Sequence, residues 1–171
     1  MGKVNLFATT LSEEPRVPRY GLKKVAFRAV PGARVPDQAV PVPECLQLEN
    51  LAVVSGPNET TRVYVRLRVG EEVREATAYG DRAVNAAYEA VEYLTCMPVK
   101  VEDSSVRSVT VGPEVMSEAM VRVYNDDYPV VGYATYPDEV TASVLAYVNV
   151  LNQVAEERRS AARRVRELGP I

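Results

Sequence analysis

The sequence predicts an α+β domain made of two tandem βββα units. Each unit has an antiparallel sheet covered by one helix, and a pseudo-twofold axis relates the two units. Three observations support this prediction: segments with alternating apolar and polar residues, two segments with apolar residues at helical spacing, and an internal repeat. The repeat superposes Gly56-Pro57 on Gly112-Pro113 without a gap.

Composition limits the function. The chain has 171 residues, a net charge of −3 and no histidine. Histidine-dependent nucleophiles, metal sites and acid–base pairs are therefore excluded, and neither a P-loop nor a GxGxxG motif is present. We expect a cytoplasmic, non-catalytic protein without cofactor or metal. No apolar run is long enough to cross a membrane, and the two cysteines, Cys45 and Cys96, are expected to be reduced and buried.

The first 46 residues differ from the rest in composition. They contain half of the twelve prolines, and only residues 23–30 alternate like a strand. We expect an extended, proline-rich arm over residues 1–46, lying on another subunit. The alternative is a flexible leader without a fixed position.

The first unit is predicted over residues 47–98. Residues 49–56, 61–70 and 71–79 alternate as three strands. A helix follows, with Asp81 as the expected N-cap and Pro98 as its stop signal. Its apolar stripe consists of Val84, Ala87, Tyr88, Val91 and Leu94.

The second unit is predicted over residues 99–155, beginning with a strand over residues 99–112. The last helix continues as a charged extension over residues 156–171. This extension carries five arginines, which suit either a solvated helix end or an acidic partner such as nucleic acid. The acidic net charge of the chain argues against nucleic acid.

Two segments are candidate ligand sites. The turn before the first helix, AYGDRAV, offers a glycine, free helix N–H groups for a carboxylate and a small apolar wall. In the strand over 99–112, Glu102 and Asp103 are candidates to receive an ammonium group. A plain capped turn and a strand end with exposed acids are the alternatives. The NDDYP segment is predicted to be a turn, because calcium needs more ligands.

Three blocks resemble the C-terminal regulatory (allosteric, dimerisation) domain of 2-isopropylmalate synthase and citramalate synthase. They are GDRAVNA at 80–86, EDSSVRSVTVG at 102–112 and VGYATYPDEVTASVLAYVNVLN at 131–152. The resemblance covers about residues 48–154 and implies the same βββα duplication. It also implies a homodimer that binds leucine or isoleucine and inhibits the attached catalytic barrel.

The resemblance implies a ligand site at the first helix and the strand that follows. We therefore expect the ligand-binding residues to be Gly80, Asp81, Arg82, Val84, Asn85, Val101, Asp103, Ser104, Ser108, Val115 and Ser117. Arg82 and Ser104 depart from the family pattern: the first replaces a glycine and the second a tyrosine. Arg82 either crowds the ligand carboxylate or supplies a charge to it.

The family's catalytic barrel has no counterpart in the sequence. We expect a free-standing regulatory chain that docks on a separate synthase subunit; a domain cut from a longer protein is the alternative. A second hypothesis is a dimerisation or scaffold module of the same fold that has lost ligand binding through Arg82 and Ser104.

Overall fold

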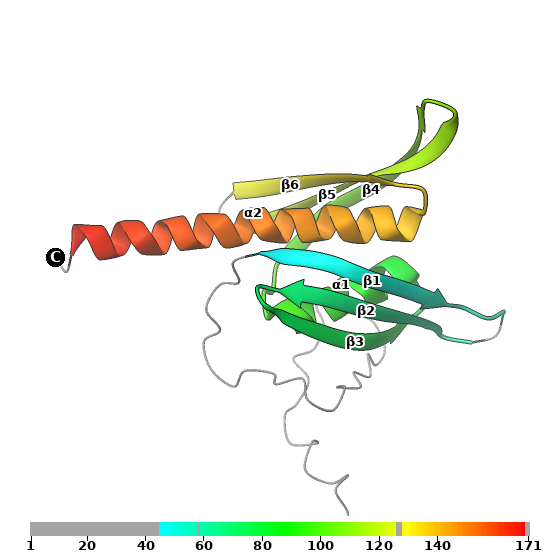
Figure 1. Cartoon of the computed structure of the whole chain (residues 1–171), viewed down its shortest axis with the longest axis horizontal. Helices are drawn as coiled ribbons and strands as arrows, with labels where there is room; N and C mark the ends of the chain where they lie inside the picture. Colours follow the sequence, from blue (N-terminus) through cyan, green and yellow to red (C-terminus); the bar gives the residue numbers. More distant parts are fainter. Residues whose placement is uncertain (1–44, 58, 126–127, 170–171) are drawn as a thin grey trace, which may run out of the picture.

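The computed structural model describes residues 45–57, 59–125 and 128–169. The chain forms β1 (Leu46–Val54), β2 (Thr61–Val69), β3 (Glu72–Gly80), α1 (Ala83–Thr95), β4 (Lys100–Val111), β5 (Glu114–Asn125), β6 (Tyr128–Tyr136) and α2 (Glu139–Leu168), as Figure 1 shows. This order confirms two βββα units in an α+β fold. The predicted arm, including its strand over residues 23–30, lies outside the described residues except for Cys45 and Leu46.

Each unit forms one antiparallel sheet with its strands in sequence order, β1-β2-β3 and β4-β5-β6. Alternation on the central strands decides which face is covered. Val63, Val65 and Leu67 of β2 are fully buried, and so are Val121 and Val123 of β5. Helix α1 packs on β2 and β3, whereas α2 packs on β5 and β6. Burial of these apolar faces is the main stabilising term.

Helix α2 also joins the two sheets, because it lies between β6 and β1 (Figure 1). Leu46 N–H donates to Asn152 Oδ1 at 2.8 Å, and Asn152 Nδ2 donates to Leu46 O at 2.9 Å. On the other side, Asn149 Nδ2 donates to Tyr133 O at 2.8 Å. Amides of one helix therefore satisfy backbone groups on two sheet edges.

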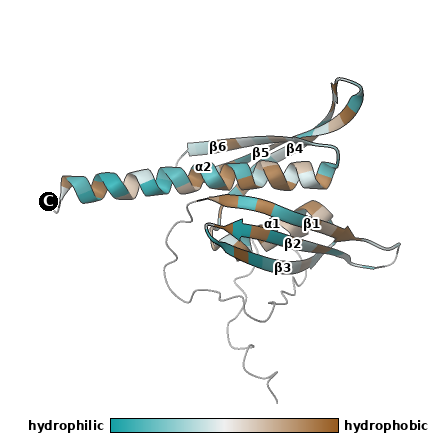
Figure 2. Cartoon of the chain, viewed as in Figure 1, coloured by the Kyte–Doolittle hydropathy of each residue, from teal (hydrophilic) through white to brown (hydrophobic). Residues whose placement is uncertain are grey.

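The last turns of α2 extend beyond both sheets. All described residues from Ala161 onward are exposed, and Figure 2 shows that this part of the helix is mainly hydrophilic. Two of the arginines nearer the sheets have partners: Arg158 donates to Asn125 Oδ1, and Arg159 pairs with Glu156.

The repeat is closely matched from the second strand of each unit onward. Val65 lies opposite Ala76, and the equivalent Val121 lies opposite Gly132. The first hairpins differ. Strands β4 and β5 join through a two-residue turn at Gly112-Pro113, where Gly112 has φ +61°.

The β1–β2 connection is longer, since its last pair joins Val54 to Arg62. If β4 and β5 kept the strand register of β1 and β2, Arg107 would lie opposite Val121. Ser104, three residues earlier in β4, lies opposite Val121 instead. Equivalent Gly-Pro pairs thus lie in unlike turns.

Helix α2 packs directly against the backbone of β6 at Gly132. A Cβ atom there would lie 2.5 Å from Ala146 O, 2.5 Å from Val150 Cγ2 and 2.9 Å from Val150 N. The equivalent residue in the first unit is Ala76, which is buried without such a clash. The absence of a side chain at Gly132 therefore allows α2 to contact the sheet backbone.

The structure tests the sequence predictions for Asp81 and for the two cysteines. The N-cap of α1 is Arg82, without a side-chain hydrogen bond, so the prediction of Asp81 was wrong. Asp138 does cap α2, because its carboxylate accepts from Thr141 N–H at 2.7 Å. Both cysteines are exposed rather than buried, since Cys45 precedes β1 and Cys96 is the C-cap of α1 with φ 52°.

Candidate functional site

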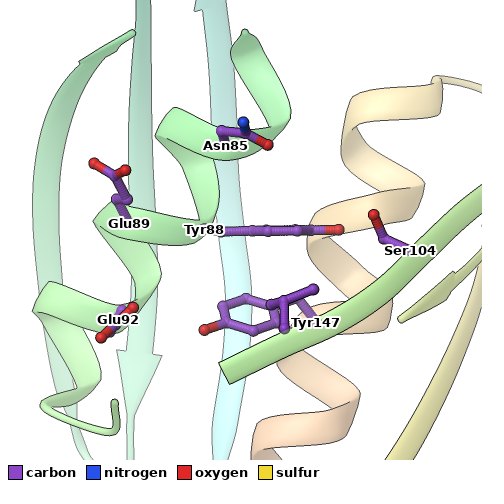
Figure 3. Close-up of a pocket in the computed structure, with 7 residues that line it drawn as sticks. Asn85, Tyr88, Glu89, Glu92, Ser104 and Tyr147 are labelled. Atoms are coloured by element: carbon purple, nitrogen blue, oxygen red, sulfur yellow. The ribbon is translucent and has the colours of Figure 1, made fainter. Parts of the chain in front are cut away.

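A pocket of about 90 Å³ lies where α1, β4 and α2 meet, at the junction of the two units (Figure 3). Its wall combines aromatic rings, carboxylates, an amide and a hydroxyl. The lining residues are Asn85, Tyr88, Glu89, Glu92, Val101, Ser104 and Tyr147.

Helical spacing places four of these residues on one face of α1. Residues three or four positions apart share a helix face. This spacing relates Asn85, Tyr88, Glu89 and Glu92, and their common face lines the pocket. Asn85 lies in the first turn of the helix, whereas the two glutamates lie further along. The polarity of the wall therefore changes along α1, from an amide near the N-terminus to carboxylates near the centre.

Two stacked tyrosines form the apolar part of the pocket. Tyr88 extends from α1 toward α2, and Tyr147 extends from α2 toward α1 (Figure 3). Their ring centroids are 4.5 Å apart and their planes are tilted by 33°, which is a favourable geometry for aromatic pairs. The Tyr88 hydroxyl donates to Ser143 O at 3.5 Å, and burial raises the pKa of Tyr88, so its hydroxyl stays protonated.

Glu89 is the unusual group on this wall. The residue is only 7% exposed, and neither carboxylate oxygen has a hydrogen-bond partner among the described residues. Burial, and secondarily the charge of Glu92, raises the pKa of Glu89 to about 7. A buried carboxylate without a partner is costly. Glu89 can therefore accept a cationic group or keep a proton near neutral pH.

The structure brings three of the predicted site residues together in the pocket. Asn85 comes from α1, and Val101 and Ser104 come from β4. The two segments were proposed as separate candidate sites, and the fold places them on facing walls. Ser104, where the family pattern has a tyrosine, contributes a small hydroxyl side chain there.

The other predicted residues of the helix turn lie next to the pocket, outside its lining. Gly80 ends β3 and is buried, whereas Asp81 and Arg82 are exposed and Val84 is half-buried. Within the described part of the chain, the side chain of the N-cap Arg82 makes no hydrogen bond to the first turn of α1. Its first N–H groups therefore remain available to a negatively charged group.

The predicted residues of the second sheet divide between its two faces. Ser108 lies opposite Ser117 on the helix-side face, toward the end of the β4–β5 hairpin where Val115 is 69% exposed. Asp103 lies opposite Arg122. Since the neighbouring Val121 and Val123 face the core, Asp103 points away from the pocket, and so it lies apart from Asn85.

Sequence reasoning missed four lining residues. Tyr88 was assigned only to the apolar stripe, and Tyr147 was not considered for the site. Glu89 and Glu92 were passed over, although like charges three residues apart destabilise an isolated helix and share a face with Tyr88. That pair was the signal available in the sequence.

Other site types are not found among residues 45–57, 59–125 and 128–169. These residues contain no group of three or more side chains suited to a metal ion. Within the same ranges, no helix combines the length and the apolar character needed to cross a membrane. Residues 126 and 127 of the NDDYP segment lie outside the described part.

Comparison with known proteins places this two-unit architecture in a class of regulatory and assembly domains attached to biosynthetic enzymes. The profile of the LeuA allosteric (dimerisation) domain matches residues 33–155, and the chain belongs to this family. Membership fits a non-catalytic domain.

Relatives named 2-isopropylmalate synthase align with most of the chain. The protein of Dictyoglomus turgidum is 37% identical over 71% of this chain and 24% of its own length. The protein of Brevibacillus brevis is 34% identical over 74% of this chain and 25% of its own length. The chain therefore spans about a quarter of the length of these curated relatives.

Proposed function

We propose that this domain binds a branched-chain amino acid, leucine or isoleucine, in the pocket between α1, β4 and α2, and thereby controls a 2-isopropylmalate synthase-like enzyme by feedback. The observation that carries the proposal is the meeting of Asn85 with Val101 and Ser104 on facing walls. These residues come from the two segments that family resemblance connects with the ligand.

The chemistry of the pocket suits a small zwitterion. Tyr88, Tyr147 and Val101 offer an apolar surface for a short aliphatic side chain, while Asn85 and Ser104 can donate to a carboxylate. The volume of about 90 Å³ is well below the range of roughly 300–1,000 Å³ that drug-sized ligands occupy. A nucleotide or coenzyme A is therefore a poor fit.

The start of α1 supports the orientation of the ligand. The N-cap Arg82 makes no side-chain capping bond, and a helix N-terminus attracts negative charge. A ligand carboxylate would therefore point toward Asn85 and the first turn. Its ammonium group would then point toward the centre of the helix.

A second copy of the chain is the proposed partner on the uncovered end of the second sheet. The β4–β5 hairpin extends past the first turn of α2 (Figure 1). Val106, Val115 and Tyr136 are exposed there, on the same face of the sheet. Covering this apolar patch in a homodimer would also enclose Ser108, Val115 and Ser117, which the pocket leaves outside.

Calorimetric titration of the purified chain with leucine, isoleucine and valine tests the proposal, with lysine as the control. Saturable binding of one branched-chain amino acid is expected. Heats that show no binding of any of them, from protein shown to be folded and dimeric by light scattering, would overturn the sensor and leave a dimerisation module. An Arg82→Gly variant tests whether the N-cap side chain crowds the ligand.

Control of an enzyme requires a separate test. The chain is immobilised and offered a purified 2-isopropylmalate synthase catalytic domain, with and without leucine. Recovery of the synthase, in an amount that leucine changes, is expected. No recovery under either condition would contradict docking on a separate synthase and leave amino-acid binding untouched.

A further inference from the structure

One carboxylate of the pocket has no partner in the fold. Glu89 is more than nine-tenths buried and lines the pocket, and no hydrogen bond from the described residues reaches either of its carboxylate oxygens. Elsewhere in the described chain, buried polar side-chain atoms are satisfied. A polar group left in this state at a pocket wall is suited to a ligand that supplies the missing donors.

The surroundings of Glu89 specify the charge of that ligand. Glu92 adds a second carboxylate on the same helix face, and none of the described lysines and arginines lines the pocket. The faces of Tyr88 and Tyr147 lie in the same wall, and aromatic faces attract cations. The walls from β4 add only Val101 and Ser104, which do not carry charge.

We propose that Glu89 binds the ammonium group of the ligand, so that the pocket selects molecules with a primary ammonium beside a short apolar body. This inference rests on the proposed function and deepens it. It assigns charge recognition to the middle of α1, whereas the sequence pointed to Glu102 and Asp103. Asp103 lies on the opposite face of β4 and Glu102 is not among the lining residues. Of the two carboxylates that line the pocket, Glu89 is the one whose buried oxygens have no partner among the described residues.

The arrangement also orients an amino acid. Asn85 and Glu89 are one helical turn apart on the pocket face of α1. A carboxylate near Asn85 and the free N–H groups of the first turn leaves the ammonium group near Glu89. The aliphatic side chain then contacts Tyr88 and Tyr147. A single helix face thus provides donors at one end and acceptors at the other.

Three probes separate the charges of the ligand: leucine, 3-methylbutylamine without the carboxylate, and 4-methylpentanoate without the ammonium. Each probe is titrated into the wild-type chain, a Glu89→Gln variant and a Glu71→Gln control. Glu71 is an exposed turn residue away from the pocket. We expect Glu89→Gln to weaken leucine and the amine by about tenfold or more, because a charge-assisted bond is lost. The acid and the control should be unaffected.

Proton release gives a second readout that a structural role would not produce. Burial and Glu92 raise the pKa of Glu89 to about 7, so binding an ammonium group near that pH should drive a proton off the carboxyl group. The other titratable groups on the pocket wall are Glu92 and Tyr88 of α1 and Tyr147 of α2. Calorimetry in buffers of different ionisation enthalpy should detect the released proton in wild type, and the Glu89→Gln variant should lose it.

The outcomes distinguish this inference from the proposed function. If Glu89→Gln leaves the affinity for leucine unchanged, the proposed role of Glu89 is overturned, while the proposal that the domain binds an amino acid stands. If leucine does not bind the wild-type chain, the proposed amino-acid sensing is overturned. The titration with 3-methylbutylamine then tests the role of Glu89. Amine binding that the variant loses would support it, and no amine binding would overturn it.

Discussion

Gly132 offers a direct test of how closely α2 contacts the second sheet. In a Gly132→Ala variant, the new methyl group would lie 2.5 Å from both Ala146 O and Val150 Cγ2. One of these neighbours is backbone, so the helix must move rather than a flexible side chain. Overpacking of this kind costs about 1–3 kcal/mol, and we expect the upper end.

One smaller effect of opposite sign enters the estimate for Gly132→Ala. Replacing glycine by alanine in a strand recovers about 0.5–1 kcal/mol of backbone entropy. A net loss of about 2 kcal/mol therefore remains. For a domain of this size it corresponds to a fall in Tm of roughly 4–8 °C.

Urea denaturation followed by circular dichroism measures the change in the free energy of unfolding. The midpoint should fall while the m-value stays unchanged. The opposite substitution at the equivalent residue, Ala76→Gly, should also destabilise, by about 1–2 kcal/mol, because a buried methyl group is lost in a strand. Gly56→Ala, where the nearest contact is an ordinary 3.4 Å, should change stability by less than about 0.5 kcal/mol. A Gly132→Ala protein as stable as wild type would refute the packing argument.

Three further predictions concern charges and hydrogen bonds. Because the pKa of Glu89 is raised from 4.5 to about 7, the folded state holds this proton more tightly than the unfolded chain. Stability should therefore fall as the pH rises through this interval. Urea titrations across it should show that Glu89→Gln removes the fall, and an equal slope in the variant would contradict the assignment. Asp138→Ala should lower the free energy of unfolding by about 1 kcal/mol, because the α2 cap is lost. Asp81→Ala should change it by less than about 0.5 kcal/mol in thermal unfolding. Equal losses in the two variants would contradict the observed caps. Asn152→Ala should cost about 1–3 kcal/mol and speed amide exchange at Leu46, and unchanged exchange would show that these bonds contribute little.

The sequence predicted the parts of the fold that depend on local periodicity. Alternation on β2 and apolar spacing on α1 identified the elements, because one buried face leaves a regular pattern. The repeat identified the second unit for the same reason. The longer β1–β2 connection was not predictable, because identical Gly-Pro pairs are compatible with turns of different length.

The site was predicted less well than the fold, for a physical reason. Asn85, Val101 and Ser104 were named from two segments, but their meeting depends on how α1 packs beside α2 and β4. Asp81 fits the residue preference of an N-cap, yet the N-cap of α1 is one residue later, at Arg82. Preference alone does not fix the first residue of a helix.

The position of α2 has a consequence for how the chain reaches its fold during synthesis. Backbone groups of Leu46, at the start of β1, hydrogen-bond to the side chain of Asn152 in α2. The backbone carbonyl of Tyr133 in β6 accepts from Asn149 of the same helix. Helix α2 follows both sheets in the chain, so these sheet edges stay open until the helix has been synthesised. Open edges invite pairing between nascent chains. The domain therefore has a long aggregation-prone interval, and a truncation before Asn152 should leave it permanently in that state.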